Sequence, residues 1–175
     1  IDGLVLAHAR NAGELNLTPR DIYMALAAAP WGKPNKAKTW KDVNSKLPAI
    51  KIEVLGPPPT SGTRDAFNDL YMDVGCNTNA AMAALKKSNE AKYKATCTKI
   101  REDGAFVEAG ENDNLIVQKL ASNPNALGVF GYSYLEENLD KLKGVTIKGV
   151  KPTYDTIASY AYPGSRPLYI YVKSA

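Results

Sequence analysis

The sequence contains only two cysteines, Cys76 and Cys97, and a single histidine, His8. Two cysteines are too few for a disulfide-rich scaffold, and with one histidine they cannot assemble the usual structural zinc patterns. We therefore expect no metal site, and no motif indicates a cofactor. In an exported protein the two thiols would pair, whereas in a cytosolic protein they would more often be buried and reduced.

Long apolar runs are also missing. The longest stretches, such as residues 22–30, are far shorter than the ~20 residues that a membrane-spanning helix needs. The chain begins at Ile1 without a basic and then apolar leader, so we expect any signal peptide to have been removed. With 175 residues, 45% of them hydrophobic and 23% charged, the chain has the size and composition of one globular domain.

The sequence lacks the common catalytic and nucleotide-binding motifs. No Gly-x-Ser-x-Gly elbow and no Gly-x-Gly-x-x-Gly fingerprint occurs. Five residues separate Gly56 from Gly62, and the residue after Thr63 is Arg64, so the segment does not fit a Walker loop. His8 lies among apolar neighbours and is expected to be a core or strand-end residue. We therefore predict that the protein is not an enzyme.

Charge and aromatic content do not indicate a nucleic-acid partner. The net charge is +4, and the lysines are spread along the chain, as on an ordinary solvated surface. Ten tyrosines accompany three phenylalanines, but Tyr169 and Tyr171 alternate with Ile170 and Val172 instead of with basic residues. This alternation favours a half-buried strand over a surface on which bases stack.

Apolar periodicity predicts that strands and helices alternate along the chain. The clearest helix starts at Thr18-Pro19, where Thr18 can cap the helix and Pro19 suits its first position. A second helix is expected from Ser61, with Phe67, Leu70, Tyr71 and Val74 on one face and Gly75 as its C-cap. Further strands are expected over residues 1–9, 50–55, 104–108, 126–132, 145–150 and 168–172. Further helical segments are expected over residues 78–100 with a break near 88–89, after a cap at Asn112 or Asp113, along Leu135, Leu139 and Leu142, and over residues 153–159.

This order predicts the α/β class: a three-layer, mainly parallel sheet with helices on both faces, in one unit without an internal boundary.

The most informative segment is Leu55-Gly-Pro-Pro-Pro-Thr-Ser-Gly-Thr-Arg-Asp-Ala-Phe67, in which a strand leads through three prolines into a helix. Free backbone N–H groups and the positive end of the helix dipole point outward at such a helix start, which suits an anion. The hydroxyls of Ser61 and Thr63 can donate to an oxyanion, and Gly62 lets the backbone approach it. Arg64 adds a permanently charged fork.

Several motifs resemble, in the same order, the phosphate-binding proteins of bacterial phosphate ABC transporters, over nearly the whole chain. They are the opening Ile-Asp-Gly-Leu-Val, Leu17-Thr-Pro before a helix, Thr60-Ser-Gly-Thr-Arg-Asp-Ala-Phe67, Leu127-Gly-Val-Phe-Gly-Tyr132, and the closing Tyr162-Pro-Gly-Ser-Arg-Pro-Leu-Tyr-Ile-Tyr-Val172.

The resemblance implies one lobe of a two-lobed periplasmic-binding-protein fold of type II. Residues 1–175 would be the second lobe, with hinge strands at about 1–9 and 166–175, and the first lobe is absent from this chain. Ser61, Gly62, Thr63 and Arg64 would contact inorganic phosphate, and Asp65 is a further candidate as proton acceptor. Many members carry an arginine just before Ser-Gly-Thr, where this chain has Pro57, Pro58 and Pro59, so Arg64 would have to replace it.

The resemblance also implies a periplasmic or extracellular location, a Cys76–Cys97 disulfide, and the missing lobe and a membrane permease as partners. Another oxyanion such as sulfate, molybdate or a phosphonate is the alternative ligand. A fragment of a phosphoryl-transfer enzyme is the alternative class. Exposed lobe-interface surface would also favour a homo-oligomer.

Overall fold

The computed structural model describes residues 2–109, 112–167 and 172–174. The strands are β1 Asp2–Ala9, β2 Asn16–Leu17, β3 Val54–Gly56, β4 Phe106–Glu108, β5 Leu127–Gly131, β6 Leu142–Gly144, β7 Thr146–Ile147 and β8 Ser165–Arg166. The helical segments are α1 Pro19–Leu26, η1 Pro30–Gly32, α2 Trp40–Val43, α3 Gly62–Phe67, η2 Asn68–Met72, α4 Asp73–Cys76, α5 Ala81–Ser88, α6 Glu90–Cys97, α7 Asp113–Ser122, α8 Tyr132–Glu137 and α9 Tyr154–Ala158.

Among the described residues, six strands form one sheet in the order β4-β3-β5-β1-β6, with β8 also paired to β1. β3 is parallel to β4 and β5, whereas β1 is antiparallel to β5, β6 and β8. Every strand of this sheet except β1 therefore runs in the same direction. β2 and β7 form a separate parallel pair. The predicted mainly parallel sheet is confirmed, with the first strand as its one reversed member.

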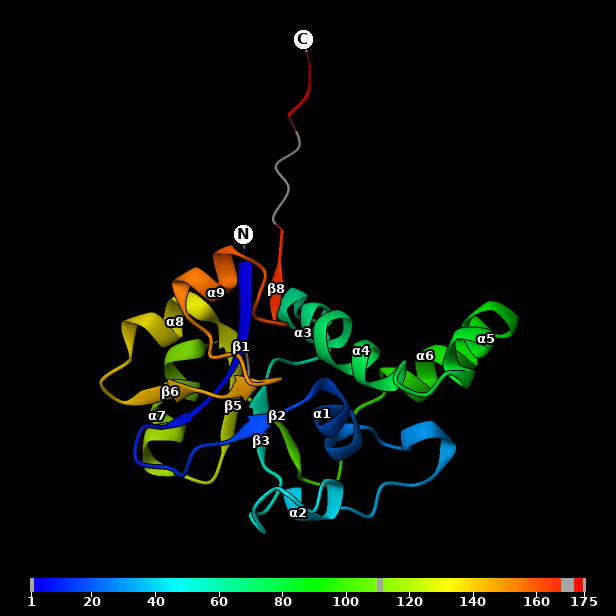
Figure 1. The fold of residues 1–175 in the computed structure, drawn as a ribbon, viewed down its shortest axis with the longest axis horizontal. Coiled ribbons are helices and arrows are strands. Elements are labelled where there is room, and N and C mark those ends of the chain that lie inside the picture. Colours follow the sequence, from blue (N-terminus) through cyan, green and yellow to red (C-terminus); the bar gives the residue numbers. More distant parts are fainter. Residues whose placement is uncertain (1, 110–111, 168–171, 175) are drawn as a thin grey trace.

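Helices cover both faces of the sheet (Figure 1). α7 and α8 pack against β1 and β5 from one side, and α3 packs against the same two strands from the other. α1 lies outside the run formed by α3, η2 and α4 and contacts its second half. β1 runs through the middle of the core, where Val5, Leu6 and Ala7 have no exposed surface. The three-layer α/β architecture is therefore confirmed.

The helix predicted from Thr18 is present, and it starts with a reciprocal cap. The Thr18 hydroxyl accepts a hydrogen bond from the Asp21 N–H at 3.1 Å, and the Asp21 carboxylate accepts one from the Thr18 N–H at 3.0 Å. The helix ends at Leu26 because Ala27 already has an extended backbone. It is thus shorter than the apolar pattern, which continues to Ala29.

The helix after Ser61 differs from its prediction because η2 is a π-helical turn inside a continuous helical run. A π turn adds a residue and shifts the helical phase, so the predicted apolar face does not continue past it. Phe67 and Tyr71 are buried as expected, but Val74 is 45% exposed.

The prediction that Gly75 is a C-cap is wrong, because this residue lies within α4. A Cβ at position 75 would collide with the Pro19 carbonyl oxygen and the Tyr23 side chain. The glycine is therefore required for close packing between α4 and α1.

Two other expectations need correction in extent. Residues 50–53 lie outside β3, although Lys51 forms an isolated bridge with Thr39. Leu139 is exposed, and Leu142 belongs to β6 instead of to the helix α8. Residues 168–171 of the expected closing strand, which belong to the expected hinge segment 166–175, lie outside the described residues, and Val172 is not in a strand. Within the described residues, no helix has both the length and the apolar character needed to cross a membrane.

Candidate functional site

The segment that carries the Ser-Gly-Thr motif lies where β3 ends and α3 begins. Parallel strands present their carboxyl ends at one edge of a sheet, and α/β proteins bind ligands outside that edge. Gly56, at the end of β3, and Gly131, at the end of β5, lie at this edge, together with the start of the reversed strand β1. The start of β1 and its partner β8 lie side by side on this side of the lobe (Figure 1).

The start of α3 is capped by Ser61, which is buried. Its hydroxyl oxygen accepts a hydrogen bond from the Thr63 N–H at 3.1 Å, and its carbonyl accepts one from the Arg64 N–H at 3.1 Å. The Gly62 N–H has no acceptor among the described residues. A cap thus satisfies part of the helix start and leaves one N–H group and the hydroxyl hydrogen of Ser61 available to an anion.

Arg64 contacts the loop that precedes α3. Its guanidinium donates to the Pro57 carbonyl at 3.0 Å and lies over the Phe106 ring, 4.9 Å from the ring centroid. The side chain is only 8% exposed. Burial lowers the pKa of Arg64, and the carboxylates of Glu108 and Asp65 partly oppose that shift. Arg64 therefore holds the proline loop against β4.

A hollow of about 430 Å³ lies in front of the α3 start. Ser61, Gly62 and Thr63 line it from α3 and its cap, and Pro57, Ile116 and Val129 supply apolar wall. Two charged residues complete the lining: Asp113 from the start of α7 and Arg166 from β8. The structure therefore brings Ser61, Gly62 and Thr63 together as expected, whereas Arg64 and Asp65 are not among the residues that line the hollow.

Arg166 and Asp113 were not recognised as site residues from the sequence. Arg166 reaches the hollow because β8 pairs with the start of β1, where Asp2 is its register partner. Asp113 is the first residue of α7, and Asn112 supplies the cap by accepting from the Leu115 N–H at 3.3 Å. Burial raises the pKa of the Asp113 carboxyl. Ser165 and Arg166 belong to the closing motif of the sequence. That motif was the one sequence signal for Arg166 as a positively charged residue of the site.

The hollow has groups that can hold a small oxyanion: a helix-start N–H, two hydroxyls and a guanidinium. His8 is far from this arrangement in the fold, since it lines a separate hollow with Glu14, Trp40 and Leu47. Burial and the nearby Lys143 lower the pKa of His8 to about 4, against the opposing effect of Glu14. Among the described residues, no group of His, Cys, Asp or Glu side chains is arranged to hold a metal ion.

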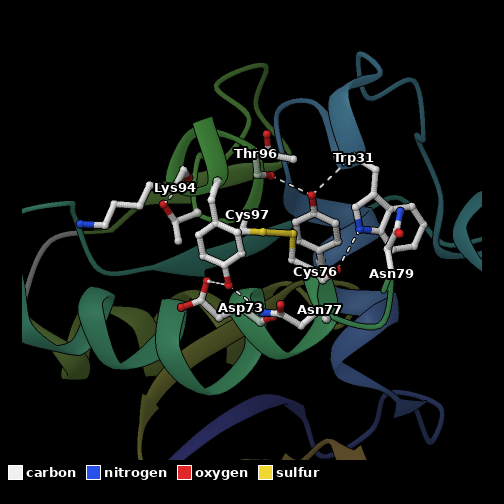
Figure 2. The surroundings of a disulfide bond; sticks show 12 residues. Trp31, Asp73, Cys76, Asn77, Asn79, Lys94, Thr96 and Cys97 are labelled. Atoms are coloured by element: carbon white, nitrogen blue, oxygen red, sulfur yellow. Dashed lines mark hydrogen bonds between the residues drawn. A yellow bond between two sulfur atoms is a disulfide. The ribbon is translucent and has the colours of Figure 1, made fainter. Parts of the chain in front are cut away.

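Cys76 and Cys97 form a disulfide, with their Cα atoms 5.3 Å apart (Figure 2). The bridge joins the end of α4 to the end of α6 and has no exposed surface on either cysteine. The Cys76 carbonyl accepts from the Trp31 indole N–H at 3.0 Å, and the neighbouring Thr96 carbonyl accepts from the Tyr23 hydroxyl at 2.7 Å. The bridge and these hydrogen bonds attach α6 to the body of the lobe.

The fold is that of an α/β ligand-binding lobe, and comparison with known proteins agrees. A family model described as the PBP superfamily domain matches residues 1–175. The chain belongs to that superfamily.

Curated relatives give the same result. The phosphate-binding protein PstS of Staphylococcus saprophyticus is 37% identical over 141 residues, which cover 78% of this chain and 35% of that protein. PstS of Staphylococcus haemolyticus is 37% identical over 143 residues, or 79% of this chain and 36% of that protein. The chain thus spans about a third of the length of these curated relatives.

Solved structures match over nearly the whole chain. A possible phosphate-binding protein from Planctomyces limnophilus superposes with a TM-score of 0.66 at 29% identity, covering 92% of this chain and 49% of that one. PstS from Borrelia burgdorferi superposes with a TM-score of 0.63 at 20% identity, covering 93% of this chain and 54% of that one, and this likeness supports the fold alone. The predicted resemblance is confirmed at the level of the family and the fold.

Proposed function

We propose that this chain is one lobe of the phosphate-binding component of a bacterial phosphate ABC transporter and that it acts without catalysis. The observation that carries the proposal is the capped start of α3, where Ser61, Gly62 and Thr63 line one hollow with Arg166. The names of the curated relatives support phosphate as the ligand. The partners would be inorganic phosphate, the first lobe and a membrane permease, in the periplasm or outside the cell.

The coverage of a solved structure and the pairing of β1 with β8 support the proposal of two lobes. The chain covers about half of the Planctomyces structure. The start of β1 and the strand β8 pair at the edge that carries the hollow, so further chain on either side would emerge there. A first lobe attached at this edge would close over the hollow and contact the second side of the bound phosphate.

The two arginines would have different roles. Arg166 lines the hollow and would contact phosphate oxygens through charge-assisted hydrogen bonds. Arg64 would act on the site by fixing Pro57, and the direct contact expected from the sequence stays a prediction. Replacing Arg166 with Gln should weaken phosphate binding. Replacing Arg64 with Gln should lower stability, because the Pro57 carbonyl loses its donor.

Phosphate titration followed through backbone amide NMR signals tests the proposal. The Gly62 and Thr63 signals should move with phosphate and return when it is removed, with chloride as the ionic-strength control. Ser61→Ala should weaken binding, whereas the matched cap variant Thr39→Ala should not, because Thr39 caps α2 through the Asp42 N–H. If neither this chain nor a longer product of its gene responds to phosphate, the proposal is wrong. A stronger response to sulfate would favour the alternative oxyanion.

A further inference from the structure

One buried polar side chain of this protein has no hydrogen-bond partner within the part of the chain that the structure describes. It belongs to His8, the single histidine, which is only 3% exposed. Glu14 and Lys143 act on its ring through their charges, and neither forms a hydrogen bond with it. Buried polar groups in folded proteins are almost always paired, and one left unpaired costs free energy. The imidazole therefore needs a partner that the described residues do not supply.

His8 lies at the opposite edge of the sheet from the start of α3. β1 runs antiparallel to β5, β6 and β8, so its start lies at the edge that carries the hollow in front of α3 and its end lies at the other edge. His8 is the last residue but one of β1, and Leu127 begins β5 at the same edge. Figure 1 shows the end of β1 on the side of the lobe away from β8. A ligand at His8 would therefore be separate from a ligand at α3.

A second hollow, of about 330 Å³, lies beside His8 and is lined by it. Apolar residues supply most of the lining, among them Leu15, Trp40, Leu47 and Leu127. Small-molecule pockets have volumes of about 300–1,000 Å³ and combine apolar walls with a few polar groups. This His8 hollow is at the small end of that range, which suits a molecule with a single ring.

The charges around the His8 hollow favour an uncharged ligand. Glu14 and Lys46 also line the hollow, and these two exposed residues carry opposite charges that offset each other. Burial and the charge of Lys143 lower the pKa of His8 to about 4, so the imidazole is neutral at neutral pH. A charged ligand would lose its hydration against apolar walls without gaining an unopposed opposite charge.

The hydrogen-bonding capacity of His8 indicates the polar group of the ligand. A neutral imidazole has one N–H donor and one nitrogen acceptor. A hydroxyl group can both donate and accept, so it can pair with either ring nitrogen. An aromatic ring provides flat apolar surface for the walls and pairs favourably with other aromatic rings such as that of Trp40. A hydroxyl group on an aromatic ring thus matches both the walls and the unpaired imidazole.

We propose that the His8 hollow is a binding site for a small, uncharged aromatic molecule that carries a hydroxyl group, with the His8 imidazole as its hydrogen-bond partner. The apolar walls contribute affinity, and the imidazole selects the hydroxyl group. The site does not depend on the hollow in front of α3 or on the function proposed for it.

NMR titration of the chain with phenol tests this site. The protein contains one histidine, so its imidazole ring gives a single, unambiguous set of signals. Phenol at pH 7 should shift these signals in a saturable way, with a Kd of about 1 mM, and should give nuclear Overhauser contacts to the ring. The amide signals of Leu15 and Leu127 should shift with the same Kd, whereas that of Gly62 should not. These measurements use the wild-type chain and require no variant.

Two variants and a matched probe isolate the hydrogen bond. Toluene has the size of phenol but carries a methyl group in place of the hydroxyl group. His8→Leu should weaken phenol binding about tenfold and should not weaken toluene binding, as measured through the amide signals of Leu15 and Leu127. The variant removes an unpaired buried polar group, so it should fold at least as stably as wild type. His8→Gln keeps a donor and an acceptor and should lose less phenol affinity than His8→Leu.

Three results would overturn the proposal. His8 signals that do not respond to phenol at about ten times the expected Kd would show that water alone pairs with the imidazole. Equal losses of phenol and toluene affinity in His8→Leu would show that the imidazole selects nothing. Phenol contacts confined to residues outside the His8 hollow would place the ligand elsewhere. Gly62→Ala should bind phenol like wild type, so a failure of the phosphate proposal can be distinguished from a failure of this one.

Discussion

Gly62 allows the ligand site to be tested without disturbing the fold. It is the first residue of α3 and lines the hollow. A Cβ at this position would meet no atom within 4 Å, and the backbone has no positive φ. In Gly62→Ala the added methyl group would therefore occupy the space in front of the helix and clash with nothing in the protein.

The substitution should change stability and affinity in opposite directions. Replacing Gly with Ala where the backbone conformation suits Ala stabilises a protein by about 0.4–1 kcal/mol, mainly by restricting the unfolded chain. An oxyanion on the Gly62 N–H would be displaced by the methyl group and would lose a hydrogen bond that involves a charge. Such a bond contributes about 1.5–3 kcal/mol, so we expect phosphate affinity to fall by about 10- to 100-fold.

Equilibrium unfolding in denaturant measures the first effect, and phosphate titration measures the second. Gly13→Ala is a matched control, because a Cβ at Gly13 also meets no atom within 4 Å and Gly13 lies in a different hollow. The control should bind phosphate like wild type. Unchanged phosphate affinity in Gly62→Ala would refute the idea that the anion binds at the start of α3.

Three further predictions concern stability. The pKa of His8 is about 4 in the fold, below its ordinary 6.5, so the unfolded chain binds more protons between these values. Lowering the pH from 6.5 to 4 should therefore reduce the free energy of unfolding by up to about 3 kcal/mol. Denaturant unfolding measured across this pH range should show a smaller reduction in His8→Gln, and equal reductions in the two proteins would contradict this assignment. Removing the disulfide with Cys76→Ala and Cys97→Ala should lower the free energy of unfolding by about 3 kcal/mol and speed amide hydrogen exchange in α6. A decrease below about 1 kcal/mol in denaturant unfolding would count against this prediction. Arg101→Met should lower the free energy of unfolding by about 2–4 kcal/mol, because the Arg101 guanidinium pairs with Asp103 and donates to two backbone carbonyls. A variant that unfolds at the same denaturant concentration as wild type would refute this prediction.

Local signals in the sequence were sufficient where a structure depends on neighbouring residues. The α1 start follows from Thr18, Pro19 and Asp21, which lie within four positions. Thr18 and Asp21 cap each other, and Pro19 occupies the first helical position. The break between α5 and α6 falls at Asn89, whose side chain accepts from the Lys92 N–H at 3.1 Å. In both cases the interaction that decides the element joins residues three apart, so the pattern and the structure agree.

Features that depend on distant residues could not be predicted. The π-helical turn η2 changes the phase of the helix after Phe67, and no composition signal marks it. Gly75 resembles a helix terminator in the sequence, but its lack of a side chain serves the contact with Pro19, which lies far away along the chain. Periodicity describes one helix at a time, whereas these two features depend on packing between elements.

Some residues of the candidate site are brought together by the local sequence and others by the tertiary structure. Ser61, Gly62 and Thr63 are adjacent in sequence, and a helix start brings their polar groups together in any fold. The arginine that lines the hollow does not follow from the local sequence. Arg64 is adjacent to the motif but donates to the Pro57 carbonyl, whereas Arg166 comes from a strand about one hundred residues later. That arrival depends on β8 pairing with β1, the one reversed strand of the sheet. If the proposed first lobe attaches at β1 and β8, its movement about these strands would act directly on Arg166 and therefore on the anion affinity proposed for the hollow.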